Sequence, residues 1–84
     1  MVNVFITFPS VTPAQRGEAL LRKHGIRCTL RRTPRWMEER GCGYCLQLRQ
    51  NSAAEAVRLL RGAQVTFRKV YRQNGDGNVE ELAL

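Results

Sequence analysis

Two hydrophobic patterns alternate along the chain, one with the period of a β-strand and one with the period of a helix. Apolar residues at every second position predict half-buried strands, and β-branched and aromatic residues dominate the first of these stretches. The four stretches of this kind are residues 2–8, 26–32, 42–48 and 64–72. In the last stretch, Val70 falls out of phase with Val65 and Phe67. This slip predicts a β-bulge near Arg68.

Two helices are expected between these strands, at residues 12–24 and 52–61. Each begins with a capping-box pattern, in which a hydroxyl residue precedes a glutamine or glutamate by three positions. The two pairs are Thr12 with Gln15 and Ser52 with Glu55. Gly25 and Gly62 are expected to end the helices, because glycine readily adopts the left-handed conformation found there. Gly17 lies inside the first helix, which predicts that this helix lies close against the sheet.

The predicted order is strand, helix, strand, strand, helix, strand. It indicates an α+β fold of the ferredoxin-like type, a split β-α-β sandwich. In this fold a four-stranded antiparallel sheet carries both helices on one face. Residues 1–73 are expected to form this single domain and residues 74–84 a flexible acidic tail, since turn-forming residues fill 74–78. A short strand or helical turn at 79–84 is also compatible with the pattern.

The length of the chain limits what the protein can do alone. A domain of 84 residues hides only about 60% of its unfolded surface, which leaves no room for a large enclosed active site. A carrier, adaptor or binding module is therefore expected rather than a stand-alone enzyme. No run of about 18 apolar residues suggests a membrane span, and the first residues lack the basic region of a signal peptide. A cytoplasmic location is expected.

The chain is strongly basic. Fourteen Lys and Arg residues face seven Asp and Glu residues, a net charge of +7, and twelve of the fourteen are Arg. Such a field attracts nucleic acid, phosphate-rich ligands or an acidic partner protein. The competing interpretation is an Arg-rich solvated surface without a specific partner.

Three cysteines, an odd number, argue against a secreted disulfide scaffold. Cys28 falls on the apolar side of its predicted strand and is interpreted as a small core residue. His24 ends the first helix, where its cationic form is favoured by the helix C-terminus. A closed structural zinc site takes about four ligands. With these two residues assigned to structural roles, we expect no metal and no other cofactor.

Cys42 is the strongest candidate for chemistry. It lies between Gly41 and Gly43, which leave the backbone open so that amides can approach a bound anion. Arg35 and Arg40 precede it closely, and a nearby cation favours the reactive thiolate. The alternative is that Cys42 is only a small residue in a glycine-rich turn.

Cys45 completes a C-x-x-C pattern with Cys42, which suggests thiol-redox or metal-handling chemistry. In an extended strand, residues three apart are separated by about 10 Å, too far for a disulfide. A turn at Gly43 would be needed to close the gap. Cys45 has the parity opposite to Leu46 and Leu48, so it is expected on the open face of the sheet, where it could act as a resolving thiol.

Several short segments carry a resemblance that covers roughly residues 3–72. They are Phe5–Ser10, Ala14, Glu18–Leu21, Gly25-Ile26, Pro34-Arg35, Cys42-Gly43, Leu48 and Val70-Tyr71. In this order they resemble the putative selenium/sulfur carrier protein-like family. Cys45 departs from the family pattern, which usually has a small residue there.

The resemblance implies that Cys42 carries sulfur or selenium as a persulfide or selenosulfide. Cys42-Gly43 and Pro34-Arg35 correspond to the family's Cys-Gly and Pro-Arg pairs. A carrier of this kind implies two partners, a cysteine desulfurase-like donor and an acceptor enzyme. Arg35 and Arg40 would then stabilise the persulfide anion.

Two other functions stay open at this point. The first is RNA or other nucleic-acid binding, because RNA-recognition modules use the free face of such a sheet and stack bases on aromatic rings. The candidate rings are Phe5, Tyr44 and Tyr71. The second is a thiol–disulfide or metal-handling protein that uses Cys42 and Cys45.

Overall fold

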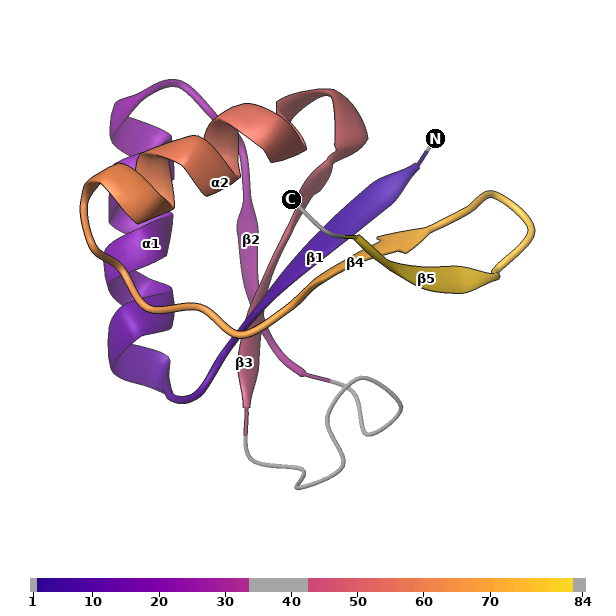
Figure 1. Ribbon diagram of the computed structural model, residues 1–84, viewed down its shortest axis with the longest axis horizontal. Coiled ribbons are helices and arrows are strands. Elements are labelled where there is room, and N and C mark those ends of the chain that lie inside the picture. The colour runs from indigo at the N-terminus through magenta and orange to yellow at the C-terminus, as the bar shows by residue number, and fades with distance from the viewer. Residues whose placement is uncertain (1, 34–42, 83–84) are drawn as a thin grey trace.

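The computed structural model describes residues 2–33 and 43–82 (Figure 1). These residues form two α-helices and five strands, and a short 3₁₀ turn, Gln50–Ser52, leads into the second helix. In chain order the elements are β1 (Asn3–Phe8), α1 (Val11–Lys23), β2 (Thr29–Arg32), β3 (Tyr44–Arg49), α2 (Ala53–Gly62), β4 (Val70–Gln73) and β5 (Val79–Leu82). Neither described helix is long and apolar enough to cross a membrane.

The described strands form one sheet in the order β2-β3-β1-β4-β5, and every neighbouring pair is antiparallel. Both helices lie on the same face of this sheet (Figure 1). The α+β class is therefore confirmed. The ferredoxin-like assignment stays a prediction.

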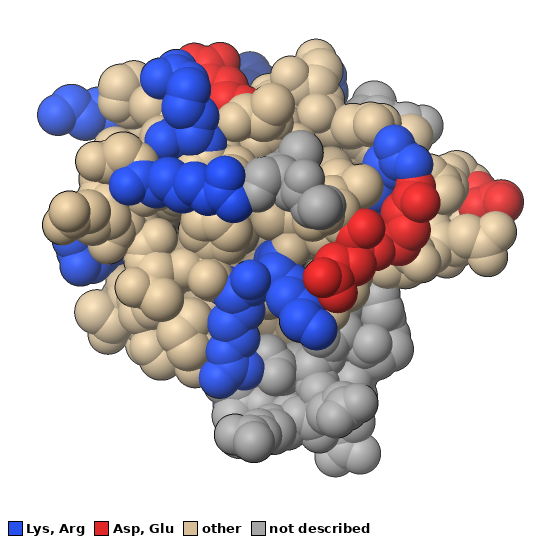
Figure 2. Space-filling view, viewed as in Figure 1, with Lys and Arg blue, Asp and Glu red and all other residues tan. Residues whose placement is uncertain are grey.

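The prediction of four strands is wrong, because the residues expected as a flexible tail contribute β5. Asn74 and Asn78 close the β4–β5 turn through a backbone hydrogen bond of 2.8 Å, and the Asp76 carboxylate accepts from the Asn78 amide. Two ion pairs, Lys69–Glu81 and Arg72–Glu80, join β5 to the neighbouring segment. Figure 2 shows acidic side chains beside basic ones over the region of the β4–β5 hairpin. The turn-rich residues thus form a hairpin.

The helix-covered face holds the main core. Alternate residues of β1 and β3 meet apolar residues of both helices there: Val4, Ile6, Phe8, Leu46, Leu48, Ala14, Leu21, Ala53, Ala56, Val57 and Leu60. A Cβ added at Gly17 would lie 3.1 Å from a Leu60 methyl carbon and 3.2 Å from the Phe8 ring. The expected close approach of the first helix to the sheet is confirmed.

The helix starts differ from the sequence prediction. Helix α1 begins at Val11 with Ser10 as the N-cap residue, so Thr12 already lies inside the first turn. Ser52 is the N-cap of α2, but its φ of −103° and ψ of −4° are helical because the 3₁₀ turn runs directly into this helix. A capping side chain acts from an extended backbone, and neither N-cap side chain makes a cap hydrogen bond. Both predicted capping boxes are wrong.

Of the two predicted helix ends, one is confirmed and the other is shifted. Gly25 has a φ of +79° and confirms the predicted left-handed end of α1. Gly62 is the last residue of α2, and the left-handed residue beyond it is Gln64, with a φ of 57°. Helix α2 therefore ends one residue later than predicted.

The predicted bulge is confirmed by the backbone hydrogen bonds of Thr7. Its carbonyl accepts from the Arg68 amide at 2.7 Å, and its amide donates to the Lys69 carbonyl at 2.8 Å. Two successive residues thus oppose one, which is the defining count of a bulge. Beyond it, Val70 turns to the helix-covered face opposite Ile6.

Candidate functional site

The candidate site lies at the end of the sheet where β2 stops and β3 begins. Of the predicted site residues, Gly43 and Cys45 are described, whereas Pro34, Arg35, Arg40 and Cys42 lie outside the described residues. The amide of Thr33 donates to the carbonyl of Gly43 at 2.9 Å. This hydrogen bond holds together the end of β2 and the start of β3.

Two arginines give this end a positive charge. Arg31 and Arg32 are the last residues of β2, and both are exposed. The Arg32 guanidinium lies 5.9 Å from the centre of the Tyr44 ring, a cation–π contact. Arg31 stands opposite Cys45 and donates to Gln47 Oε1 at 2.7 Å. These cations make the end of the sheet beside Thr33 and Gly43 positively charged.

Cys45 lies on the face of the sheet opposite the helices, as its parity predicted. It packs with Phe5, and Tyr71 covers both. The expected face is confirmed, but the side chain is fully buried, with 0% exposure. The thiol is therefore not offered to solvent on that face.

The surroundings of Cys45 keep it protonated. Burial raises the pKa of the Cys45 thiol above its ordinary value, and the Thr33 hydroxyl and the charge of Arg31 lower it to a smaller extent. The Thr33 hydroxyl is itself buried and has no partner at full hydrogen-bond geometry among the described residues. A neutral thiol is a poor nucleophile, so burial disfavours reaction at Cys45 in this conformation.

Comparison with family models matches residues 3–72 to the family described as "Putative Se/S carrier protein-like". The chain belongs to this family. The matched range runs from the start of β1 into β4 and includes both predicted motif pairs, Pro34-Arg35 and Cys42-Gly43. Searches of curated proteins and of solved structures give no match. The resemblance stated from the sequence is thus confirmed.

The other described cysteine of this Se/S carrier-like chain is a core residue. Cys28 is 7% exposed and belongs to the apolar cluster under the helices. Burial raises the pKa of its thiol, and the nearby Arg22 opposes this shift. Arg22 also donates to the Cys28 carbonyl at 3.2 Å and pairs with Glu18 at 3.4 Å. Among residues 2–33 and 43–82, no three His, Cys, Asp or Glu side chains converge as a metal site would require.

The three rings considered for base stacking are all engaged with other protein groups. Phe5 is only 5% exposed. Tyr44 packs against the helix-side core beneath Arg32, and Tyr71 packs against Phe5 and Cys45. The proposal of an RNA-binding face therefore gains no support from these positions.

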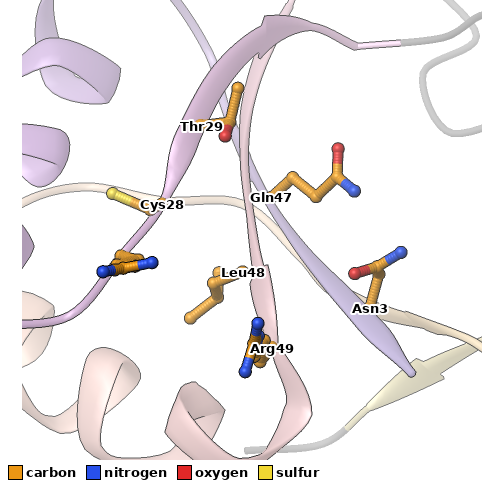
Figure 3. A pocket seen from close by; sticks show the side chains of 7 residues that line it. Asn3, Cys28, Thr29, Gln47, Leu48 and Arg49 are labelled. Atoms are coloured by element: carbon orange, nitrogen blue, oxygen red, sulfur yellow. The ribbon is translucent and has the colours of Figure 1, made fainter. Parts of the chain in front are cut away.

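One feature that the sequence analysis missed is a hollow of about 210 Å³ at the opposite end of β3 (Figure 3). We call it the β2–β3 hollow, and its lining residues are Asn3, Arg27, Cys28, Thr29, Gln47, Leu48 and Arg49. The sequence holds one hint of it, the alternation along each strand. Arg27 and Thr29 lie at outward positions of their segment, and Gln47 and Arg49 lie at outward positions of β3. Only the register of the strands, which pairs Thr29 with Gln47 and Asn3 with Arg49, brings them together.

Proposed function

We propose that this protein is a thiol-based sulfur or selenium carrier in which Cys42 bears the transferred atom as a persulfide or selenosulfide. The observation that carries the proposal is the family match over residues 3–72, since this range includes the Cys42-Gly43 pair. A carrier family implies a partner enzyme. The expected partners are a cysteine desulfurase-like donor and an acceptor enzyme, all in the cytoplasm.

The proposed transfer step is an exchange between a thiolate and a persulfide. The Cys42 thiolate attacks the outer sulfur of a donor persulfide, a new S–S bond forms, and the donor cysteine leaves as a thiolate. The oxidation state of the transferred sulfur does not change, so no external oxidant is needed. A selenium atom in the outer position would be transferred in the same way, giving a selenosulfide.

Cations near Cys42 would stabilise both anions of this step, the attacking thiolate and the product persulfide. Arg31 and Arg32 end β2 beside the Thr33–Gly43 hydrogen bond. Arg35 and Arg40 are proposed to add to this field, and Pro34 belongs to the family's Pro-Arg pair.

The other two cysteines are less suited to the carrier role. Both Cys28 and Cys45 are buried, and burial raises the pKa of each thiol, which disfavours the nucleophilic thiolate. The role of Cys45 as a resolving thiol stays a prediction, and it requires the side chain to leave its contact with Phe5.

The direct test is intact-mass analysis after incubation with a cysteine desulfurase and cysteine. We expect wild type to gain one sulfur atom, and the Cys45→Ser and Cys28→Ser proteins to gain the same. Cys42→Ser should gain none. Omitting the desulfurase is the control for spontaneous sulfuration. Uptake by Cys42→Ser equal to that of wild type would contradict the proposal.

A further inference from the structure

The β2–β3 hollow is separate from the Cys42 end of the sheet. On β3 the hollow is lined by the last three residues of the strand, Gln47, Leu48 and Arg49. Gly43 lies at the other end and immediately precedes the strand. Six residues of extended chain span about 20 Å, so the hollow lies at the end of β3 away from Gly43.

The polar side chains that line the hollow offer several hydrogen-bond donors. None of its seven residues is acidic. Figure 3 shows the Asn3 and Gln47 amides projecting to the same side of the strands. Gln47 Oε1 already accepts a hydrogen bond from Arg31 at 2.7 Å, which leaves the Gln47 amide nitrogen to donate. Thr29 adds a hydroxyl, so the combined surface favours an anion.

The two arginines of the hollow differ from three other arginines in the described part of the chain. Arg22, Arg58 and Arg72 each pair with a glutamate. Neither Arg27 nor Arg49 forms an ion pair or a side-chain hydrogen bond with any residue in 2–33 or 43–82. Their positive charge is therefore uncompensated by the described residues.

A second hollow of about 260 Å³ shares Arg49 with the first. Its other lining residues are Val2, Gln50 and Asn51. The two side-chain amides there can both donate and accept, which suits hydroxyl groups. A ligand that extends past Arg49 would meet this neutral polar surface.

We propose that the β2–β3 hollow binds the phosphate group of a small phosphorylated molecule, held between Arg27 and Arg49, with its polar body directed toward Gln50 and Asn51. Guanidinium groups present parallel N–H donors that match the oxygens of a phosphate. Gln47 and Thr29 supply further donors from the facing strands. The proposal does not rest on the carrier function, and Cys42→Ser protein is expected to bind phosphate as wild type does.

The test is an NMR titration of isotope-labelled protein with inorganic phosphate at constant ionic strength. We expect saturable shifts at Thr29, at Gln47 and at the Asn3 side-chain amide. Arg27→Gln and Arg49→Gln should each weaken binding by about tenfold or more, the effect of losing a charge-assisted interaction. Arg49→Lys keeps the positive charge but loses the paired N–H donors of the guanidinium, so it should weaken phosphate binding less than Arg49→Gln does.

The matched control is Arg16→Gln, which removes one charge from an exposed position on α1. It should weaken binding by less than about twofold, because a distant exposed charge is screened by salt. Equal weakening by Arg16→Gln and Arg27→Gln, or shifts that never saturate, would overturn the proposal in favour of diffuse charge attraction.

Two further ligands separate the possible sources of the phosphate. Ribose 5-phosphate should bind more tightly than inorganic phosphate, because its hydroxyls reach the second hollow, and ribose alone should not bind. A ten-residue oligothymidylate that binds more tightly than ribose 5-phosphate, with shifts centred on Phe5 and Tyr71, would overturn the proposal in favour of a nucleic-acid surface.

Discussion

The two faces of the sheet bury their side chains in different ways. On the helix-covered face, residues of β1 and β3 join those of α1 and α2 in one continuous apolar cluster. On the opposite face the buried apolar set is small, and it consists of Phe5 and Cys45 with Tyr71 against them. The first face therefore supplies most of the stability of the fold. The second controls the environment of a thiol three residues from the proposed carrier cysteine.

The largest difference should appear when a phenylalanine on each face is truncated. Phe8 is fully buried beneath the helices, so Phe8→Ala should lower the free energy of unfolding by about 3–5 kcal/mol. Phe5→Ala removes a ring from the small cluster, and about 2 kcal/mol is expected because little more than the transfer free energy is lost. Urea unfolding of both variants measures this. Equal losses would show that the two faces are equally well packed.

A smaller effect is expected where α1 touches the sheet. The Cβ of Gly17→Ala would lie 3.1–3.3 Å from side-chain atoms of Leu60, Phe8 and Leu46. Overpacking of this kind costs about 1–3 kcal/mol, and the better helix propensity of alanine offsets about 1 kcal/mol of it.

Gly62→Ala is the matched control, because nothing lies within 4 Å of its added Cβ. This variant should be neutral or stabilised by up to about 1 kcal/mol. Thermal unfolding of the two proteins compares them directly. A stabilised Gly17→Ala protein would mean that α1 lies farther from the sheet than described.

The sequence predicted best those features that depend on local pattern. Alternation placed Val4, Ile6 and Phe8 on one face, put Cys45 on the other, and located the bulge near Arg68. The family resemblance, carried by short segments in order, was also predicted. The strand faces and the bulge follow from the pattern of neighbouring residues, whereas the family was predicted from its resemblance alone.

Features that depend on a distant partner could not be predicted in the same way. For residues 79–84 the sequence left a strand, a helical turn and a flexible tail open. Residues 79–82 form β5 because β4 offers a free edge, and Lys69 and Arg72 pair with Glu81 and Glu80. Parity gave the face of Cys45 but not its burial, which requires the ring of Phe5 on the neighbouring strand. The β2–β3 hollow likewise depends on the register of three strands.

The smallest effect expected from the difference between the two faces is a loss of folding stability at alkaline pH, caused by the Cys45 thiol. Its pKa is raised in the folded protein, so the folded state holds the proton to higher pH than the unfolded state. This contributes stability below the unfolded thiol pKa of about 9, and the contribution is lost as pH rises through the folded value. Wild type should therefore lose more stability above pH 9 than Cys45→Ala does, as measured by urea unfolding across this range.

The control for this measurement is Cys28→Ala, which removes the buried thiol of the helix-covered face. Burial also raises the pKa of Cys28, so this variant, like Cys45→Ala, should lose less folding stability above pH 9 than wild type does. Of the two described cysteines, Cys45 is the one that stands opposite Arg31, two residues after Gly43. If Cys45→Ala and wild type lose stability in parallel, the thiol is already exposed in solution. Cys45 would then be available as a resolving thiol without any opening of the sheet face.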